Sequence, residues 1–171
     1  MDLISRTVVE RIARNLATQP TRHMSVEAER FNREQPLLAS FISAFSSQLP
    51  PAAQDLTLYL AYMLWRIFED SGATVRPVSA DTILEQIQQN WLFIERFVQM
   101  ARNATGGCLT EIDFLSQPHM LEYLTNTIFE EGGRSNIAEK HMGYMFFILK
   151  TVLDSLDAAA VTKRKESGKH P

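Results

Sequence analysis

Apolar residues recur at helical spacing through the first third of the chain. Between residues 2 and 18 they form one stripe: Ile4, Val8, Val9, Ile12 and Leu16. The charged residues of this segment lie mostly off the stripe, which predicts an amphipathic helix. A second helix is expected to open near Ser25, whose side chain can cap free backbone amides. The pattern continues across Pro36, where either a new helix starts or one long helix kinks.

The most apolar segment of the first half spans residues 52–70. Its apolar residues cover nearly the whole circumference of a helix: Leu56, Leu58, Tyr59, Leu60, Tyr62, Met63, Leu64, Trp65, Ile67 and Phe68. A helix that is apolar on all sides is a buried helix, so this segment is predicted to lie at the centre of the fold. Ser71-Gly72 is expected to end it. Residues 73–80 include β-branched residues without a nearby partner strand, which predicts a linker.

Three further helices are predicted in the second half. The first spans 82–103, capped by Ser79 or Asp81, and its core face is Ile83, Ile87, Trp91, Ile94 and Val98, broadened by Phe93 and Phe97. The second spans 119–131 and is expected to end at Gly132-Gly133. The third opens at a capping box of Asn136 with Glu139 and runs to about residue 160. No segment shows sustained strand alternation, so the pattern predicts a compact all-α bundle of six to seven helices.

The dipeptide Gln-Pro occurs twice, at 35–36 and 117–118, and apolar residues at helical spacing follow it each time. The two copies are 82 residues apart. The same shift aligns Tyr62 with Tyr144 in the two most apolar helices, and it places Val9 on Trp91 in the opening helices. One shift that serves three helices predicts two tandem three-helix repeats, about 1–72 and 80–160, related by a pseudo-twofold axis.

Neither half can bury enough surface by itself at about 80 residues, so residues 1–160 are predicted to share one core as a single domain. Ala61 and Gly143 correspond at the same shift and are both small. They are predicted to mark the closest approach of the two central helices. Each Gln of the Gln-Pro pairs has two structural alternatives: it caps the helix that Pro opens, or it contacts the opposite half.

Composition sets limits on the setting and on the partners. The chain has 171 residues, of which 45% are hydrophobic and 22% charged, as in ordinary globular proteins. A net charge of −3 gives no overall attraction for nucleic acid.

Residues 161–171 are predicted to be a disordered, polar, basic tail. The single cysteine, Cys108, suits a reducing compartment, and its reactivity stays open. The longest apolar stretch, 56–65, is shorter than the ~20 residues of a membrane span, so a cytoplasmic location off the membrane is expected.

Catalytic and metal-binding patterns are sparse. His119 and Glu122 are spaced i, i+3, in the reverse of the order found in carboxylate-bridged metal sites. Glu139 and His141 are two residues apart and face different sides of a helix. We therefore expect no metal, no cofactor and no assignable catalytic residue. An enzyme with a site around these four residues is kept as a less favoured hypothesis.

The leading functional hypothesis is a non-enzymatic module for protein–protein interaction or regulation, acting alone or as a homodimer. The first helix with its cationic flanks and the helix that carries Trp91, Phe93 and Phe97 are the candidate surfaces, because aromatic residues are enriched at interfaces. The alternative is a small apolar ligand, bound in a cavity of a few hundred Å³ between the halves. Its predicted contacts are Tyr62, Trp65, Tyr144 and Phe147.

Overall fold

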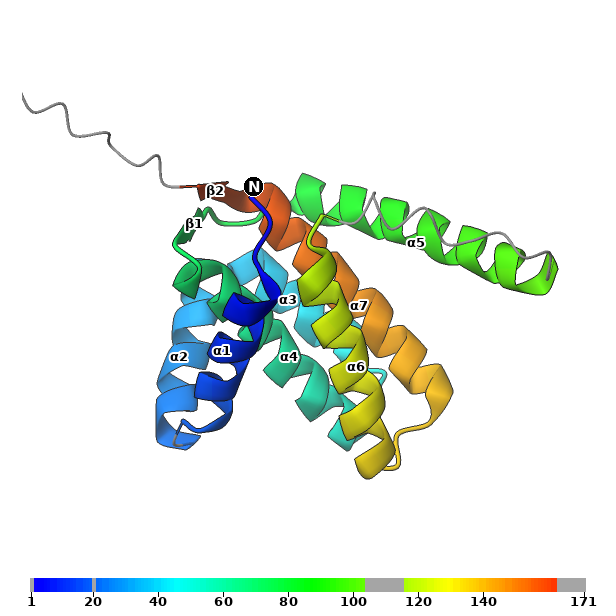
Figure 1. Cartoon of the computed structure of the whole chain (residues 1–171), viewed down its shortest axis with the longest axis horizontal. Coiled ribbons are helices and arrows are strands. Elements are labelled where there is room, and N and C mark those ends of the chain that lie inside the picture. The colour runs from blue at the N-terminus through cyan, green and yellow to red at the C-terminus, as the bar shows by residue number, and fades with distance from the viewer. Residues whose placement is uncertain (1, 20, 104–115, 163–171) are drawn as a thin grey trace, which may run out of the picture.

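The computed structural model describes residues 2–19, 21–103 and 116–162, with side-chain surroundings for 2–19, 25–95 and 116–161. Over these ranges the fold is all-α, as the sequence predicts, with seven helices and two short strands (Figure 1). The helices are α1 (Arg6–Ala17), α2 (Thr21–Glu34), α3 (Pro36–Ser46), α4 (Pro51–Asp70), α5 (Ala80–Asn103), α6 (Pro118–Arg134) and α7 (Glu139–Ala159). The strands are β1 (Ala73–Val75) and β2 (Ala160–Thr162).

Helices α4 and α7 form the centre of the molecule and pack against each other. Both are apolar around most of their circumference, so both must be covered on several sides. Leu60 and Leu64 of α4 and Ile148 and Leu149 of α7 have no solvent exposure. The central position predicted for the two most apolar segments is therefore confirmed.

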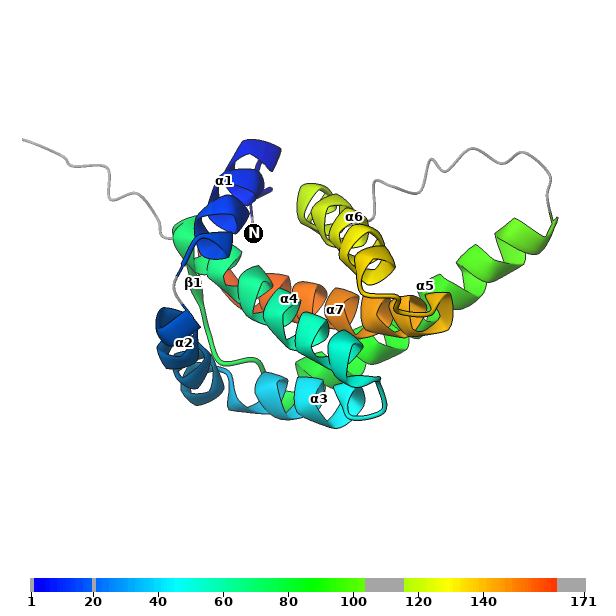
Figure 2. The same cartoon turned by 90° about the horizontal axis from the view of Figure 1, so that it is seen from below.

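The remaining helices cover this central pair. Helices α1 and α6 lie on one side of it, and α2 and α3 lie on the other (Figure 2). Helix α5 lies along α7, and its second half projects beyond the rest of the bundle (Figures 1 and 2). The described side chains of α5 end at residue 95, and several large apolar ones among them are exposed.

The two strands correct the prediction that residues 73–80 are a linker without a partner. β1 pairs antiparallel with β2, with Thr74 opposite Val161, and Arg76 adds a backbone hydrogen bond to Ala159 at 3.1 Å. Three residues are too few to show alternation, and the partner strand is distant in sequence. The predicted tail at 161–171 therefore starts inside β2, and residues 163–171 lie outside the described part.

Pro36 and Pro118 each start a helix, which decides the open question of a start against a kink. Each occupies the first helical position, where its missing N–H costs nothing, and Gln35 and Gln117 are the N-cap residues. The buried faces predicted for these helices include Leu38 and Met120, neither of which is exposed to solvent. Neither glutamine side chain caps its own helix, however.

Several predicted helix ends are wrong by a few residues. Helix α1 begins at Arg6, and Ile4 lies in the extended segment before it. Helix α2 begins before Ser25, because a residue that can cap a helix does not fix where the helix starts. Helix α7 has Ala138 at its N-cap, while Asn136 adopts a positive φ of 53° in the turn that precedes it.

The glycines of the second half do not act as predicted. Gly132 and Gly133 lie within α6, and a Cβ at position 132 would come within 2.9 Å of Cε of Met142, so the first glycine permits close packing. Gly143 is exposed, and a Cβ there would have no neighbour within 4 Å. The prediction that Gly143 marks the closest approach of the central helices is therefore wrong, because this position faces away from α4. Gly72, at a φ of 91°, follows the C-cap of α4 as expected.

Candidate functional site

Helix α5 presents large apolar side chains to solvent. The exposed fractions are 59% for Leu84, 58% for Trp91, 53% for Leu92 and 36% for Phe93. Ile83 and Ile87 face the core as predicted, but Trp91 does not belong to that buried face. Trp91 also differs from Val9, its predicted counterpart at the shift of 82, because Val9 is buried and Trp91 is exposed. Phe97 and Val98 lie outside the described side chains.

The middle of α5 is attached to α7 through a few specific contacts. The Trp91 ring meets the Phe147 ring edge-on, with centroids 6.1 Å apart. Nδ2 of the buried Asn90 donates to Oγ1 of Thr151 at 3.3 Å. The outer edge of Trp91 donates through Nε1 to the Glu95 carboxylate at 2.9 Å. These contacts fix the orientation of α5 while one side of the Trp91 ring system stays accessible.

A buried ion pair lies under the same part of α5. Lys150 is 6% exposed, and its Nζ is 2.6 Å from Oδ2 of Asp154 and 5.4 Å from the centre of the Phe93 ring. Ser116 donates to the other oxygen of Asp154 at 3.0 Å. This pair is not among the residues predicted from the sequence, although a Lys–Asp spacing of i, i+4 inside an otherwise apolar helix indicates such a pair.

The side chains of Gln35 and Gln117 each bind an extended backbone segment that is distant in sequence. Oε1 of Gln117 accepts from the Ile4 amide at 2.9 Å, and its Nε2 donates to the Asp2 carbonyl at 3.3 Å. Oε1 of Gln35 accepts from the Val78 amide at 2.9 Å, and its Nε2 donates to the Arg76 carbonyl at 3.1 Å. Neither glutamine caps its own helix: Gln117 contacts the first predicted half, whereas the partners of Gln35 lie in the segment 73–80 between the predicted halves.

Both glutamines are 1% exposed and have similar backbone angles, with φ and ψ of −129° and 56° at Gln35 and −138° and 78° at Gln117. Gln117 makes one further bond, from Nε2 to Oδ1 of Asp157 at 2.7 Å. Burial raises the pKa of the Asp157 carboxyl, and the bond from Gln117 only partly offsets this effect. We call these two arrangements the Gln35 clamp and the Gln117 clamp.

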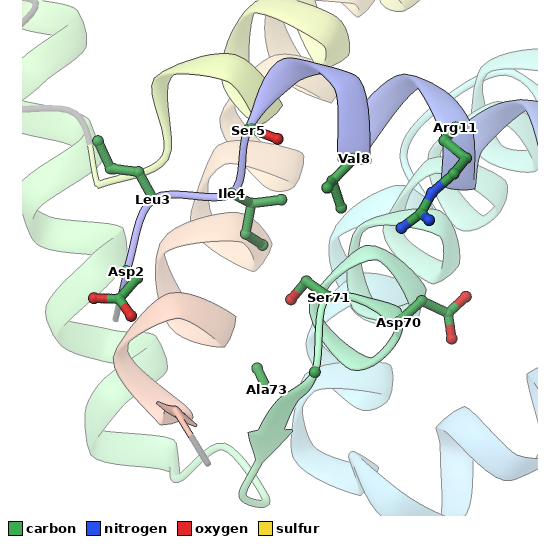
Figure 3. A pocket seen from close by; sticks show the side chains of 10 residues that line it. Asp2, Leu3, Ile4, Ser5, Val8, Arg11, Asp70, Ser71 and Ala73 are labelled. Atoms are coloured by element: carbon green, nitrogen blue, oxygen red, sulfur yellow. The ribbon is translucent and has the colours of Figure 1, made fainter. Parts of the chain in front are cut away.

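A surface pocket of about 290 Å³ lies between the start of the chain and the end of α4 (Figure 3). Its charged lining residues are Asp2, Arg11 and Asp70, with Ile4, Val8 and Ala73 among the apolar ones. In the close view, Asp2 lies across the pocket from Arg11 and Asp70. Asp70 already binds Arg66 at 3.0 Å. The lining combines apolar residues with charges of both signs, so it indicates no particular ligand.

The four residues predicted to contact an apolar ligand lie in separate environments. Tyr62 and Trp65 are neighbours on α4, with ring centroids 6.1 Å apart, and both are buried. Phe147 packs on Trp91 instead, and Tyr144 is partly exposed. None of the four lines the pocket at the start of the chain. A ligand at these residues stays a prediction.

The residues of the enzyme hypothesis do not gather in one place. His119 and Glu122 lie at the start of α6, and Glu122 pairs with Arg6 of α1 at 2.6 Å. Glu139 and His141 lie at the start of α7, beyond the far end of α6. At about 1.5 Å per residue, the intervening part of α6 separates the two pairs by roughly 20 Å. Cys108, whose reactivity was left open, lies outside the described residues.

Across the described ranges, no three His, Cys, Asp or Glu residues are grouped so that they could hold a metal ion. The helices of the same ranges include none with the length and hydropathy needed to cross a bilayer. No family model, curated protein or solved structure matches the chain.

Proposed function

We propose that this chain is a non-enzymatic module for protein–protein interaction, and that its partner covers the exposed apolar side chains in the middle of α5. The observation that carries the proposal is the run Trp91-Leu92-Phe93-Ile94. Four successive residues point in four directions around a helix, since each turns by about 100°. Three of these apolar side chains are at least 36% exposed. A helix that is apolar on all sides is normally covered on all sides.

The position of the run supports the same proposal. Leu84 lies two helical turns before Trp91, on the same side of α5, and extends the apolar surface. The charges of α5 are of both signs, with Asp81, Glu85 and Glu95 against Arg96 and Arg102. An apolar surface on the partner, a second copy of this chain included, would therefore complement the run. The cationic flank of α1, the other predicted surface, has Arg11 and Arg14 exposed but little apolar area.

Self-association is the first form of this proposal to test. The double variant Trp91→Gln/Leu92→Gln removes the centre of the surface, and Phe129→Gln on α6 is a control, since Phe129 is 61% exposed. Sedimentation velocity of the unmodified chain should show concentration-dependent association that the double variant loses and the control keeps. If the partner is a different protein, a photocrosslinking residue at position 92 should trap one defined protein in cells. The same photocrosslinking residue at position 129 should not trap that protein. A monomer without a crosslink specific to position 92 would refute the proposal.

We also propose that the fold is a duplicated unit in which each half lends its first helix to the other. The two clamps support this proposal, because Gln35 binds the segment before α5 and Gln117 binds the segment before α1. The two strands also each come after a central helix, and they pair antiparallel with each other.

This proposal changes the register of the first helices. The Gln-Pro helices and the central helices keep the shift of 82. The clamped residues Ile4 and Val78 are instead 74 apart, as are Ser5 and Ser79. At 74, Val9 meets Ile83, and both are buried. An experimental structure tests the proposal: the operation that superposes α3 and α4 on α6 and α7 must also bring α1 onto the start of α5. Failure of α1 to coincide would refute it.

A further inference from the structure

Between residues 25 and 34, helix α2 is held to the bundle by little apolar area. Of its side chains from residue 25 to residue 34, Phe31 is the one that is fully buried, and seven are exposed. The Phe31 ring lies 5.3 Å from the ring centre of Trp65 on α4. By comparison, the 12 residues of α1 bury Val9, Ile12, Ala13 and Leu16. An element with few buried apolar contacts is the one that opens most easily without global unfolding.

Charged groups supply most of the remaining attachment. Glu27 binds Arg66 of α4 and, at 3.0 Å, Arg30 of its own helix. Arg30 in turn binds Glu69 of α4, and its guanidinium carbon lies 4.5 Å from the centre of the Trp65 ring. The side chains of this network keep between 13% and 29% of their exposure, so dissolved ions can screen it.

The closed arrangement leaves polar atoms unsatisfied beneath α2. Oη of Tyr62 and Nε of Arg66 are buried and have no hydrogen-bond partner in the described part of the chain. Burial also raises the pKa of the Tyr62 hydroxyl, and the neighbouring Arg66 guanidinium only partly offsets this effect. Water that enters when α2 lifts would satisfy both atoms, which offsets part of the cost of opening.

We propose that α2 is a lid over Trp65 and Tyr62, closed by the Glu27–Arg66 and Arg30–Glu69 pairs and opened by ionic strength while the rest of the bundle stays folded. Its C-terminal end is fixed, since Gln35 follows it and is held by the Gln35 clamp. Opening exposes the aromatic face of α4. This face carries two of the residues predicted from sequence to meet an apolar ligand, so the lid controls access to them.

The test uses Trp65 as its reporter. The chain has two tryptophans, so Trp91→Phe leaves Trp65 as the single emitter. Raising NaCl from about 0.1 M to about 1 M shortens the screening length from about 10 Å to about 3 Å. We expect the acrylamide quenching constant of Trp65 to rise about twofold over this range as the lid opens. Glu27→Gln should already show the high value at low salt. Glu29→Gln, on the same helix but exposed and outside the network, should behave as its parent does.

Hydrogen exchange on the unmodified chain is an independent measurement that does not rely on a variant folding. Amides of residues 25–34 should exchange about tenfold faster in high salt, while those of α4 and α7 keep their rates. The proposal is overturned if α2 and α4 respond to salt alike, or if the α2 amides exchange through global unfolding alone. It is equally overturned if quenching of Trp65 is independent of salt and of Glu27.

Discussion

The two clamps make the sharpest prediction for stability. Gln117→Met keeps the length and volume of the side chain and removes its polar atoms. The buried amide of Ile4 then loses its acceptor, which costs about 1–3 kcal/mol. The bond to the Asp157 carboxylate is lost as well, and a bond to a charged group contributes about 1.5–3 kcal/mol. Fraying of residues 2–5 would rehydrate the amide but would uncover Ile4, which is buried.

We expect Gln117→Met to lower the free energy of unfolding by about 3–5 kcal/mol, a large part of the 5–15 kcal/mol of a typical domain. Gln35→Met, which breaks the bonds to Val78 and Arg76 but no bond to a carboxylate, should cost about 2–4 kcal/mol. Urea unfolding followed by circular dichroism at 222 nm measures both values. Hydrogen exchange should also show faster exchange at the Ile4 amide in the first variant and at the Val78 amide in the second.

Gln88→Met is the matched control, because Gln88 is exposed on α5. It should change stability by no more than about 0.5 kcal/mol. If both clamp variants fall within that range of the control, the glutamines do not hold the two halves together. A large cost at Gln117 with none at Gln35 would show that the clamps are not equivalent, and would count against the duplicated fold.

Three further outcomes are expected. Gly143→Ala should raise the free energy of unfolding by about 0.5–1 kcal/mol, because the position is helical and a Cβ there meets no neighbour. Gly72→Ala should lower the free energy of unfolding because of the positive φ at Gly72, and thermal melts compare the two variants. Since burial raises the pKa of Asp157 above its ordinary 3.8, the folded chain holds this proton more tightly, and stability is lost as pH rises from 3.8 through the raised pKa. Asp157→Asn should therefore leave stability near pH 3 unchanged and increase it at pH 7; urea titrations at the two pH values that show a loss at pH 7 would contradict this sign. Lys150→Met should cost about 3–5 kcal/mol, because the largely buried Asp154 carboxylate keeps its bond from Ser116 but loses its counter-charge. Lys150→Met/Asp154→Leu should recover most of that loss, and equal costs for the single and double variants would refute the coupling.

The fold class could be predicted from the sequence because apolar residues recur with a period of 3.6 over long segments. The central position of α4 and α7 could be predicted because both helices are apolar around most of their circumference. The pairing of β1 with β2 could not be predicted, because three residues show no periodicity and the partner strand lies at the other end of the chain. Gly132 was taken for a helix stop because glycine has that role most often, while its contact with Met142 is a tertiary fact. Leu84 and Leu92 were missed as surface residues, although the run from Trp91 to Ile94 was visible. The periodicity of the sequence predicts which face of a helix is apolar, but only the packing of the whole fold decides which apolar side chains stay exposed.

The Gln117 side chain binds both residue 2 and residue 157, and strand β2 begins three residues after residue 157. Tethers attached at residues 2 and 162 would therefore pull on the same corner of the bundle. Under tension the ladder of β1 and β2 would unzip one bond at a time, and the leading segment would peel from Gln117, before load reached the contact between α4 and α7. The molecule should yield to stretching at low force and in steps, however stable it is against heat.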